Sequence, residues 1–386
     1  MIIGIDGNEA NVENRVGIGE YGFELLQQFE SFQFSAKGGS SSGGQISNFQ
    51  FQIYLKDRPL NDLPKERMGW KYRIVGPRKL WTQIGLPFDL YTHSPRPDVF
   101  FTPTHYAPRF SPIPTVVSVM DLSYIHYPDM FKASDLYQLR SWTAYSVRRA
   151  RKVLTISKSS KNDIIKTYGV PAERVIVTYL GIKSKIKNQK SKMSENDKKL
   201  LNEKYGIGKE YILFVGTLQP RKNVARLIEA LSKIKKKDLA LVIVGKRGWL
   251  YEEILGAPKK FGVEDRVKFL DFVPDADLPA LYQNAQVFVL PSLYEGFGLP
   301  VLEAMQYGCP VITSNVSSLP EAGGDAARYV DPANVEDIAG KIEELLGNEK
   351  LRNELIKKGY KQVKKFSWEK TASQTLEVLE EVGKGL

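Results

Sequence analysis

A buried strand, a glycine turn and a helix are predicted in direct succession between residues 285 and 305. Residues 285–290 form a mostly apolar run, which indicates a buried strand. Gly296 and Gly298 allow a sharp turn and a close approach of the backbone to a ligand. Pro300 suits the first turn of a helix, where its missing N–H would have no partner in any case. The stretch is therefore a strand–turn–helix junction of the α/β kind.

This junction offers an anion free backbone N–H groups and the positive end of a helix dipole, and a phosphate is the most natural ligand. Glu295 lies at the turn, and Glu303 lies two turns into the helix. Carboxylates beside a phosphate fit best if they accept hydrogen bonds from sugar hydroxyls, one on a transferred sugar and one on the ribose of the same nucleotide. The alternative is an ordinary junction with two solvated glutamates, because short glycine motifs have many false positives.

The pattern Glu-Gly-Phe-Gly-Leu-Pro-x-x-Glu at residues 295–303 is more specific, and it resembles the signature of the retaining glycosyltransferases of family 4 (glycosyl transferases group 1). The resemblance implies an α/β fold of the GT-B type, in which two Rossmann-like domains face each other across a cleft. It also implies transfer of a sugar from a nucleotide to an acceptor. Bacterial mannosyltransferases of surface polysaccharide assembly are the members that the chain resembles most.

Bulk properties exclude several other classes of protein. The single cysteine, Cys309, rules out an internal disulfide and a cysteine-rich metal site, and its apolar neighbours predict a buried thiol. No apolar run approaches the ~18 residues that a membrane-spanning helix needs. The N-terminus starts as a strand and lacks the features of a signal peptide. A cytoplasmic protein is therefore expected.

The net charge of +11 is spread unevenly. Residues 1–190 contain 26 Lys and Arg against 16 Asp and Glu, whereas residues 191–386 contain 29 against 28. The basic half suits an anionic acceptor or the anionic inner face of a membrane, and a generally solvated surface is the alternative. Arg78, Lys79 and Trp81 begin an amphipathic stretch that could touch a membrane or a lipid-linked acceptor, although a helix that faces the core is the more probable role of its apolar residues. Nucleic acid is not expected as a partner, because no binding motif for it is present.

Two glycine-containing segments of the first half have different interpretations. Gly17 and Gly19 precede a helical run, and the family has a similar loop there. They are expected to contact the donor phosphate or the acceptor, with a simple tight turn as the alternative. Residues 36–45 are rich in glycine and serine, so this segment is predicted to be disordered and without chemistry.

Asp121 follows a predicted strand, at the end of the strand where ligands gather in open α/β sheets. Family members often carry a histidine directly before this aspartate, and it reaches the donor sugar. Met120 stands in its place here. His105 and His126 lie on predicted loops and could compensate, although a lone loop histidine is more often structural.

A basic pair lies at a predicted turn in the second half. Arg221 and Lys222 would grip a diphosphate and offset the charge of the leaving group. Lys222 matches the family's basic residue. The family often has an arginine where this chain has Thr217, and Arg221 is the expected substitute for it. Solvated surface charge is the alternative.

The resemblance also implies contacts with the rest of the donor. Residues 267–273 are predicted to form a strand, and Phe272 and Val273 lie at its end, which meets the base in the family. The nearby Asp275–Asp277 is instead interpreted as a helix cap. The remaining residues expected to bind the donor are Gly216, Lys246, Gly296, Phe297, Gly298 and Leu299.

Four segments are predicted. Residues 1–184 form an acceptor domain, residues 185–208 a linker, and residues 209–366 a nucleotide-sugar-binding domain. The family's usual ending implies that a helix at about 367–386 packs back on the first domain.

The sequence thus predicts a hexosyltransferase that acts with retention and without a metal ion. Arg221, Lys222 and the helix N-terminus would stabilise the leaving group, Glu295 would hold the sugar and Glu303 the ribose. No cofactor is expected beyond the donor, for which GDP-mannose is favoured and a UDP-hexose comes second; the acceptor would be a glycan or lipid-linked. The alternatives are a phosphorylase or sugar-nucleotide epimerase of the same fold, or a non-catalytic anion-binding protein, which the missing histidine at Met120 favours.

Overall fold

The computed structural model describes residues 1–34, 49–183, 200–201, 203–207 and 210–385. The glycine- and serine-rich segment 36–45 and much of the predicted linker 185–208 lie outside these residues.

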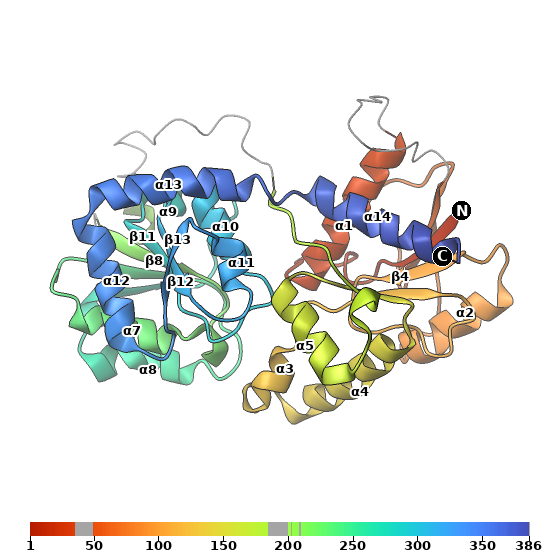
Figure 1. Ribbon diagram of the computed structural model, residues 1–386, viewed down its shortest axis with the longest axis horizontal. Coiled ribbons are helices and arrows are strands. Elements are labelled where there is room, and N and C mark those ends of the chain that lie inside the picture. The colour runs from red at the N-terminus through yellow and green to blue at the C-terminus, as the bar shows by residue number, and fades with distance from the viewer. Residues whose placement is uncertain (35–48, 184–199, 202, 208–209, 386) are drawn as a thin grey trace. The chain divides into compact units, whose positions relative to one another are not determined.

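The chain divides into two compact units. Unit 1 comprises Met1–Gly181 and Ser367–Leu386, and unit 2 comprises Ile182–Phe366. Each unit is an open parallel sheet with helices on both faces, which confirms the prediction of two Rossmann-like α/β folds (Figure 1).

Unit 1 contains a seven-stranded sheet in the order β3-β2-β1-β4-β5-β6-β7. The strands are β1 Ile2–Asp6, β2 Gln50–Leu55, β3 Trp70–Ile74, β4 Val99–Thr102, β5 Thr115–Ser118, β6 Lys152–Thr155 and β7 Val175–Val177. Its helices and helical turns are α1 Ile18–Phe34, η2 Trp81–Gly85, α2 Leu86–Thr92, α3 Ser123–His126, η3 Pro128–Met130, α4 Ala133–Arg149, α5 Lys158–Tyr168, η4 Ala172–Arg174 and α14 Trp368–Gly383. The residues of β4 and β5 are all buried, as expected for central parallel strands.

Unit 2 contains a six-stranded sheet in the order β10-β9-β8-β11-β12-β13. The strands are β8 Tyr211–Val215, β9 Ala240–Val244, β10 Val267–Leu270, β11 Val287–Leu290, β12 Val311–Ser314 and β13 Ala327–Val330. Its helices and turns are η5 Pro220–Lys222, α7 Val224–Lys233, α8 Glu252–Phe261, η6 Glu264–Arg266, α9 Leu278–Asn284, α10 Leu299–Gln306, α11 Leu319–Gly323, α12 Val335–Gly347 and α13 Glu349–Val363.

The last helix, α14, belongs to unit 1 although it follows unit 2 in the sequence. It packs on α1 and on β4, and the rings of Tyr21 and Trp368 lie 6.3 Å apart between their centroids. The hydroxyl of Thr371 also donates to the backbone carbonyl of Tyr179 at 2.5 Å. These contacts tie the end of the chain to the core of unit 1.

Strand order places candidate sites at two positions. In unit 1 the chain builds outward from β1 through β2 to β3 and then returns to β4 on the other side of β1. Unit 2 does the same from β8 to β10 and then β11. Such switch points leave a crevice at the carboxyl ends of the strands, where ligands of open α/β sheets bind.

Two further expectations can be compared with the structure. Cys309 is buried, with 2% of its surface exposed, as predicted. Within the described residues, no helix has the length and apolarity needed to cross a bilayer.

Candidate active site

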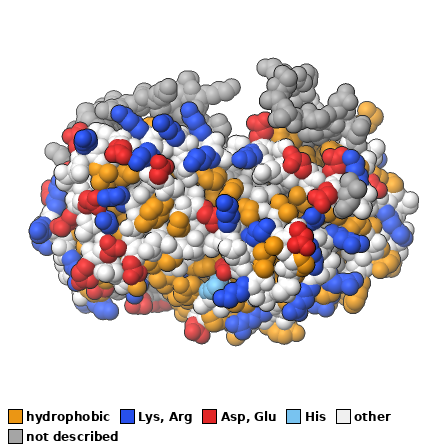
Figure 2. Space-filling model, viewed as in Figure 1, with side chains coloured by type: hydrophobic (Ala, Val, Ile, Leu, Met, Phe, Trp, Pro, Cys, Tyr) orange, Lys and Arg blue, Asp and Glu red, His pale blue; other side chains and the backbone are white. Residues whose placement is uncertain are grey.

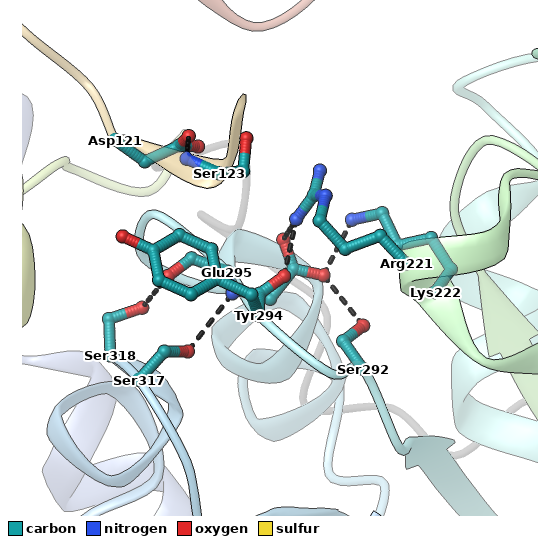
Figure 3. Close-up of polar contacts among 9 residues, drawn as sticks. All are labelled: Asp121, Ser123, Arg221, Lys222, Ser292, Tyr294, Glu295, Ser317 and Ser318. Carbon is teal, nitrogen blue, oxygen red and sulfur yellow. Dashed lines mark hydrogen bonds and ion pairs between the residues drawn. The ribbon is translucent and has the colours of Figure 1, made fainter. Parts of the chain in front are cut away.

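Glu295 lies at the centre of an ionic cluster at the switch point of unit 2 (Figure 3). Its Oε1 accepts hydrogen bonds from Lys222 Nζ at 2.6 Å and from the Ser292 hydroxyl at 2.7 Å. Its Oε2 lies 3.1 Å from Arg221 Nη1. The guanidinium of Arg221 also donates to the carbonyl of Tyr294. The structure thus brings together Glu295 and the basic pair, which the sequence placed in the site separately.

Backbone contacts hold this cluster in place. The Glu295 N–H donates to the Ser317 hydroxyl at 3.0 Å, and the Ser318 hydroxyl donates to the Glu295 carbonyl at 2.8 Å. Asn223 follows η5 in a left-handed conformation with φ of 61°. Its side-chain amide donates to the carbonyls of Pro291 at 2.9 Å and of Pro332 at 2.7 Å. The turns after β8 and β11 are therefore fixed to each other.

The two cations determine the ionisation of Glu295. Burial alone raises the pKa of this carboxyl, but Lys222 and then Arg221 outweigh burial and lower the pKa to about 2. Glu295 is therefore ionised at every physiological pH. A carboxylate that already neutralises one of two adjacent cations is a poor nucleophile and a good anchor for their side chains.

The glycine turn after Glu295 is built as predicted, with Pro300 in the first turn of α10. Gly298 has a φ of 100°, and a Cβ placed on it would lie 2.8 Å from Leu319 Cδ2. The turn therefore needs glycine for its conformation and for packing against α11. The Phe297 side chain is buried and packs edge-on against Phe366, with centroids 5.3 Å apart. Only the backbone of Phe297 is therefore available to contact a nucleotide-sugar donor.

Glu303 lies on α10 and accepts a hydrogen bond from the Tyr282 hydroxyl at 3.0 Å. Burial raises the pKa of Glu303, and the bond from Tyr282 only partly opposes this. Sequence reasoning missed Tyr282, because it lies 21 residues away on α9 and carries no motif. Because the Tyr282 hydroxyl already donates its proton to Glu303, the pair offers oxygen acceptors to the hydroxyl groups of a ligand.

The residues expected near the base fall into two groups. Lys246 Nζ lies 5.5 Å from the ring centroid of Phe272, and 67% of the Phe272 surface is exposed. Val273 is buried instead. Gly216 lies so close to Gly245 that a Cβ on Gly245 would meet the Gly216 carbonyl oxygen at 2.0 Å. Lys246 and Phe272 thus form one accessible surface. Gly216 and Gly245 allow the turn after β8 to contact the turn after β9.

In unit 1, the predicted glycines shape the loop after β1. Gly17 is exposed and has a φ of 51°, the left-handed conformation that glycine adopts readily. Gly19 lies in the first turn of α1, and a Cβ there would meet the Glu9 carbonyl oxygen at 2.7 Å. Gly19 therefore lets the loop that carries Glu9 pack closely against α1.

Asp121 is half-buried, and its Oδ1 accepts the Ser123 N–H at 2.8 Å (Figure 3). Nearby, His105 is buried, and its Nε2 accepts the backbone N–H of Met120 at 3.1 Å. Burial lowers the pKa of His105, although Asp121 opposes this, so the ring is neutral. His105 thus supports the backbone of Met120. The second candidate histidine, His126, lies with its Nε2 3.1 Å from Asp163 Oδ2.

The structure decides between the two roles considered for Trp81 and contradicts the interpretation of Asp277. Trp81 is 2% exposed and donates through Nε1 to the Val75 carbonyl at 2.9 Å, so it faces the core, which was the more probable role, and not a membrane. Asp277 occupies the N-cap position of α9 without capping it, because its backbone is helical and not extended. Its carboxylate instead accepts from Lys204 Nζ at 2.6 Å and from the Tyr205 hydroxyl.

Comparison with known families gives two matches. The profile described as Glycosyltransferase Family 4 matches residues 50–185, and that described as Glycosyl transferases group 1 matches residues 197–362. The chain is also 33% identical to the O-antigen chain mannosyltransferase B of Escherichia coli over 360 residues, which cover 92% of this chain and 88% of that protein.

Solved structures extend the similarity to the fold. The sucrose-phosphate synthase from Thermosynechococcus elongatus has a TM-score of 0.73 at 18% identity, covering 100% of both chains. Anabaena Alr3699/HepE, solved in complex with UDP and glucose, has a TM-score of 0.71 at 19% identity, covering 98% of this chain and 99% of that one. At these identities the likeness concerns the fold alone.

Proposed function

We propose a function on the basis that the chain belongs to glycosyltransferase family 4 and has its GT-B fold. The chain would transfer a hexose from a nucleotide diphosphate sugar to a glycan or lipid-linked acceptor in surface polysaccharide synthesis. Mannose is the favoured sugar, with GDP-mannose as donor and a UDP-hexose as the second choice. The O-antigen mannosyltransferase at 33% identity supports this order.

The observation that carries the proposal is the cluster around Glu295. In the transfer, the bond between the anomeric carbon and the diphosphate breaks, and charge builds on the departing phosphate. Arg221 and Lys222 are oriented by Glu295 before any ligand arrives, so they stabilise that charge without reorganising. Glu295 keeps acceptor capacity on Oε2 for a hydroxyl of the transferred sugar. Arg221 and Lys222 supply the positive charge that offsets the negative charge of the leaving group, so we propose that no metal ion is required.

The resemblance implies that the acceptor oxygen attacks on the face that the leaving group vacates. The acceptor proton would then pass to the departing phosphate oxygen, and the anomeric configuration would be retained. The pKa of about 2 for Glu295 agrees with an anchoring role and not with covalent attack.

The rest of the donor would lie along the carboxyl edge of unit 2. We assign Glu303 to the ribose hydroxyls, because its carboxylate accepts hydrogen bonds from hydroxyl groups and is held in place by the Tyr282 hydroxyl at 3.0 Å. Phe272 and Lys246 would border the base. The backbone of residues 296–299 would contact the diphosphate.

A cytoplasmic enzyme with a lipid-linked acceptor would also touch the inner face of a membrane. Basic side chains alternate with acidic and apolar ones on the face that Figure 2 shows, so charge alone does not locate this contact. An apolar stripe along η2 and α2 is a better candidate, formed by Leu80, Ile84, Phe88 and Tyr91, which are 57%, 53%, 66% and 49% exposed. The exposed Arg78 and Lys79 lie beside it in sequence and suit anionic lipid.

Binding of GDP-mannose, UDP-glucose and UDP-galactose to the native chain, with slow hydrolysis of each, tests the function. Lys222→Ala should weaken binding of the preferred donor and lower its hydrolysis about 100-fold or more, because it removes one charge from the leaving-group site. Glu303→Ala should weaken binding of the whole nucleotide. Lys233→Ala, which changes an exposed lysine at the end of α7, serves as the control. Failure of every nucleotide sugar to bind would contradict the proposal.

A further inference from the structure

A small polar pocket of about 190 Å³ lies in unit 1. Its lining includes Asp6, Glu9, Lys56, Tyr106 and Trp142. At ~30 Å³ per water molecule, this volume corresponds to about six waters. The space suits a single sugar ring and not an extended chain.

Topology places this pocket where a ligand site of unit 1 is expected. Asp6 ends β1, and Lys56 directly follows β2. Thr104, also in the lining, comes two residues after β4. Because β1 lies between β2 and β4, the pocket lies at the switch point, on the carboxyl edge of the sheet.

The lining combines aromatic rings with planar polar groups. Trp142 of α4 packs edge-on against Tyr106, with centroids 5.4 Å apart, and both line the pocket. Amide side chains of Asn8, Gln83 and Gln138 lie around them. Apolar ring faces with hydrogen-bonding groups between them match a pyranose, which has C–H faces and a rim of hydroxyls.

Charge in this pocket disfavours an anion. Asp6 and Glu9 carry two negative charges against the single positive charge of Lys56. Asp6 is 5% exposed, and its Oδ1 accepts from the Asn8 N–H at 3.1 Å and from Asn8 Nδ2 at 2.7 Å. Burial raises the pKa of Asp6 to about 6, so at neutral pH the carboxylate is held ionised at a cost in stability. Two carboxylates are good acceptors for hydroxyl groups and would repel a phosphate.

The opposite edge of the same sheet has the reverse character. A larger hollow of about 810 Å³ borders the first residues of β5 and β6. Its lining contains Arg148, Arg149 and Arg151, and the described residues that line it include no Asp or Glu. These basic residues of the first half thus lie away from the carboxyl edge. An anionic acceptor would fit the arginine-lined hollow better than the small pocket.

We propose that the pocket of Asp6, Glu9, Tyr106 and Trp142 binds the terminal ring of an uncharged glycan acceptor. This inference rests on the proposed function and narrows it, because it selects a neutral sugar over a phosphate-bearing head group as the group that accepts the hexose. Glu9 and Asp6 accept the ring hydroxyls, and Trp142 with Tyr106 covers an apolar face of the ring.

Intrinsic tryptophan fluorescence can report on the site, because Trp81 and Trp142 both line it. Methyl α-mannoside, methyl α-glucoside and methyl α-galactoside are titrated as neutral probes, with mannose 6-phosphate as the anionic counterpart. We expect at least one neutral glycoside to bind with a Kd on the order of 1 to 10 mM. Mannose 6-phosphate should bind at least about tenfold more weakly than methyl α-mannoside.

Two variants connect the signal to the pocket. Glu9→Gln and Trp142→Ala should each weaken binding of the neutral glycoside about tenfold. Glu9 is exposed, so its substitution is not expected to disturb folding, whereas Trp142 is half-buried. Glu13→Gln, a change to another exposed carboxylate of the same loop, is the matched control and should bind as the native chain does.

The inference is overturned if no neutral glycoside binds, if the phosphate binds as tightly, or if both variants bind like the native chain. Donor binding by the same preparation separates this failure from that of the proposed function. Donor binding without glycoside binding would remove the neutral acceptor alone. Glycoside binding without donor binding would leave the pocket in place and remove the transferase.

Discussion

Among single residues, Glu295 makes the clearest prediction about stability. Glu295→Gln should destabilise unit 2 by on the order of 3 kcal/mol at pH 7, because Arg221 and Lys222 lose their counter-charge. Since folding lowers the pKa of Glu295 from 4.5 to about 2, the stabilisation is fully present above pH 4.5 and is lost as the pH falls toward 2. Urea unfolding midpoints of both proteins between pH 2 and pH 7 would measure this.

The difference between native chain and variant should therefore shrink in acid. Glu253→Gln, at an exposed carboxylate in the first turn of α8, is the control and should change stability by no more than about 0.5 kcal/mol. If the destabilisation caused by Glu295→Gln stays constant down to pH 2, then Arg221 and Lys222 do not lower the pKa of Glu295 as inferred.

The same cluster shows how far a sequence can specify a site. The residue types of Arg221, Lys222 and Glu295 indicated an anion and a sugar, and all three lie together. Their direct pairing was not predictable, because the two cations lie 74 and 73 residues from Glu295 in the sequence. Only the adjacency of β8 and β11 brings them within bonding distance. Tyr282 was also missed because it lies far from its partner in the sequence, 21 residues from Glu303.

Among the secondary-structure elements, the turn into α10 depends on one glycine. Gly298→Ala should destabilise unit 2 by about 2–4 kcal/mol, because the residue has a φ of 100° and its Cβ would meet Leu319 Cδ2 at 2.8 Å. Gly340→Ala in α12 is the matched control, since a Cβ there meets no atom within 4 Å. It should stabilise the helix by up to about 1 kcal/mol. Equal effects in thermal unfolding would contradict the packing argument.

The stripe on η2 and α2 yields a prediction about membranes. Native protein should sediment with vesicles of phosphatidylglycerol more strongly than with vesicles of phosphatidylcholine. The double substitution Ile84→Ser and Phe88→Ser should reduce this binding at least about tenfold, because each apolar side chain contributes roughly 1.5–3 kcal/mol when fully buried. Tyr137→Ser, at a side chain on α4 that is 72% exposed, should leave binding unchanged. Equal sedimentation of all three proteins would remove the stripe as a membrane contact.

For the whole chain, the alternation of apolar runs with amphipathic segments was enough to predict two parallel α/β folds. Strands β8, β9 and β11 each contain four consecutive buried residues, and such uninterrupted apolar runs are easy to recognise in a sequence. The sequence left two roles open for Trp81, a contact with the core and a contact with a membrane. The segment around it is amphipathic, and periodicity alone does not say which face turns inward. In the structure, the Trp81 side chain lies in one buried cluster with Tyr54, Leu86 and Phe100.

The assignment of α14 to unit 1 gives a prediction about the independence of the units. Leu379 is fully buried in α14, and Leu355 of α13 is 4% exposed in unit 2. Each Leu→Ala change should cost about 2–5 kcal/mol and lower one thermal transition by roughly 5–15 °C. Because we place the nucleotide in unit 2, GDP or UDP should raise the transition that Leu355→Ala lowers. If nucleotide instead raised the transition that Leu379→Ala lowers, the donor site would belong to unit 1.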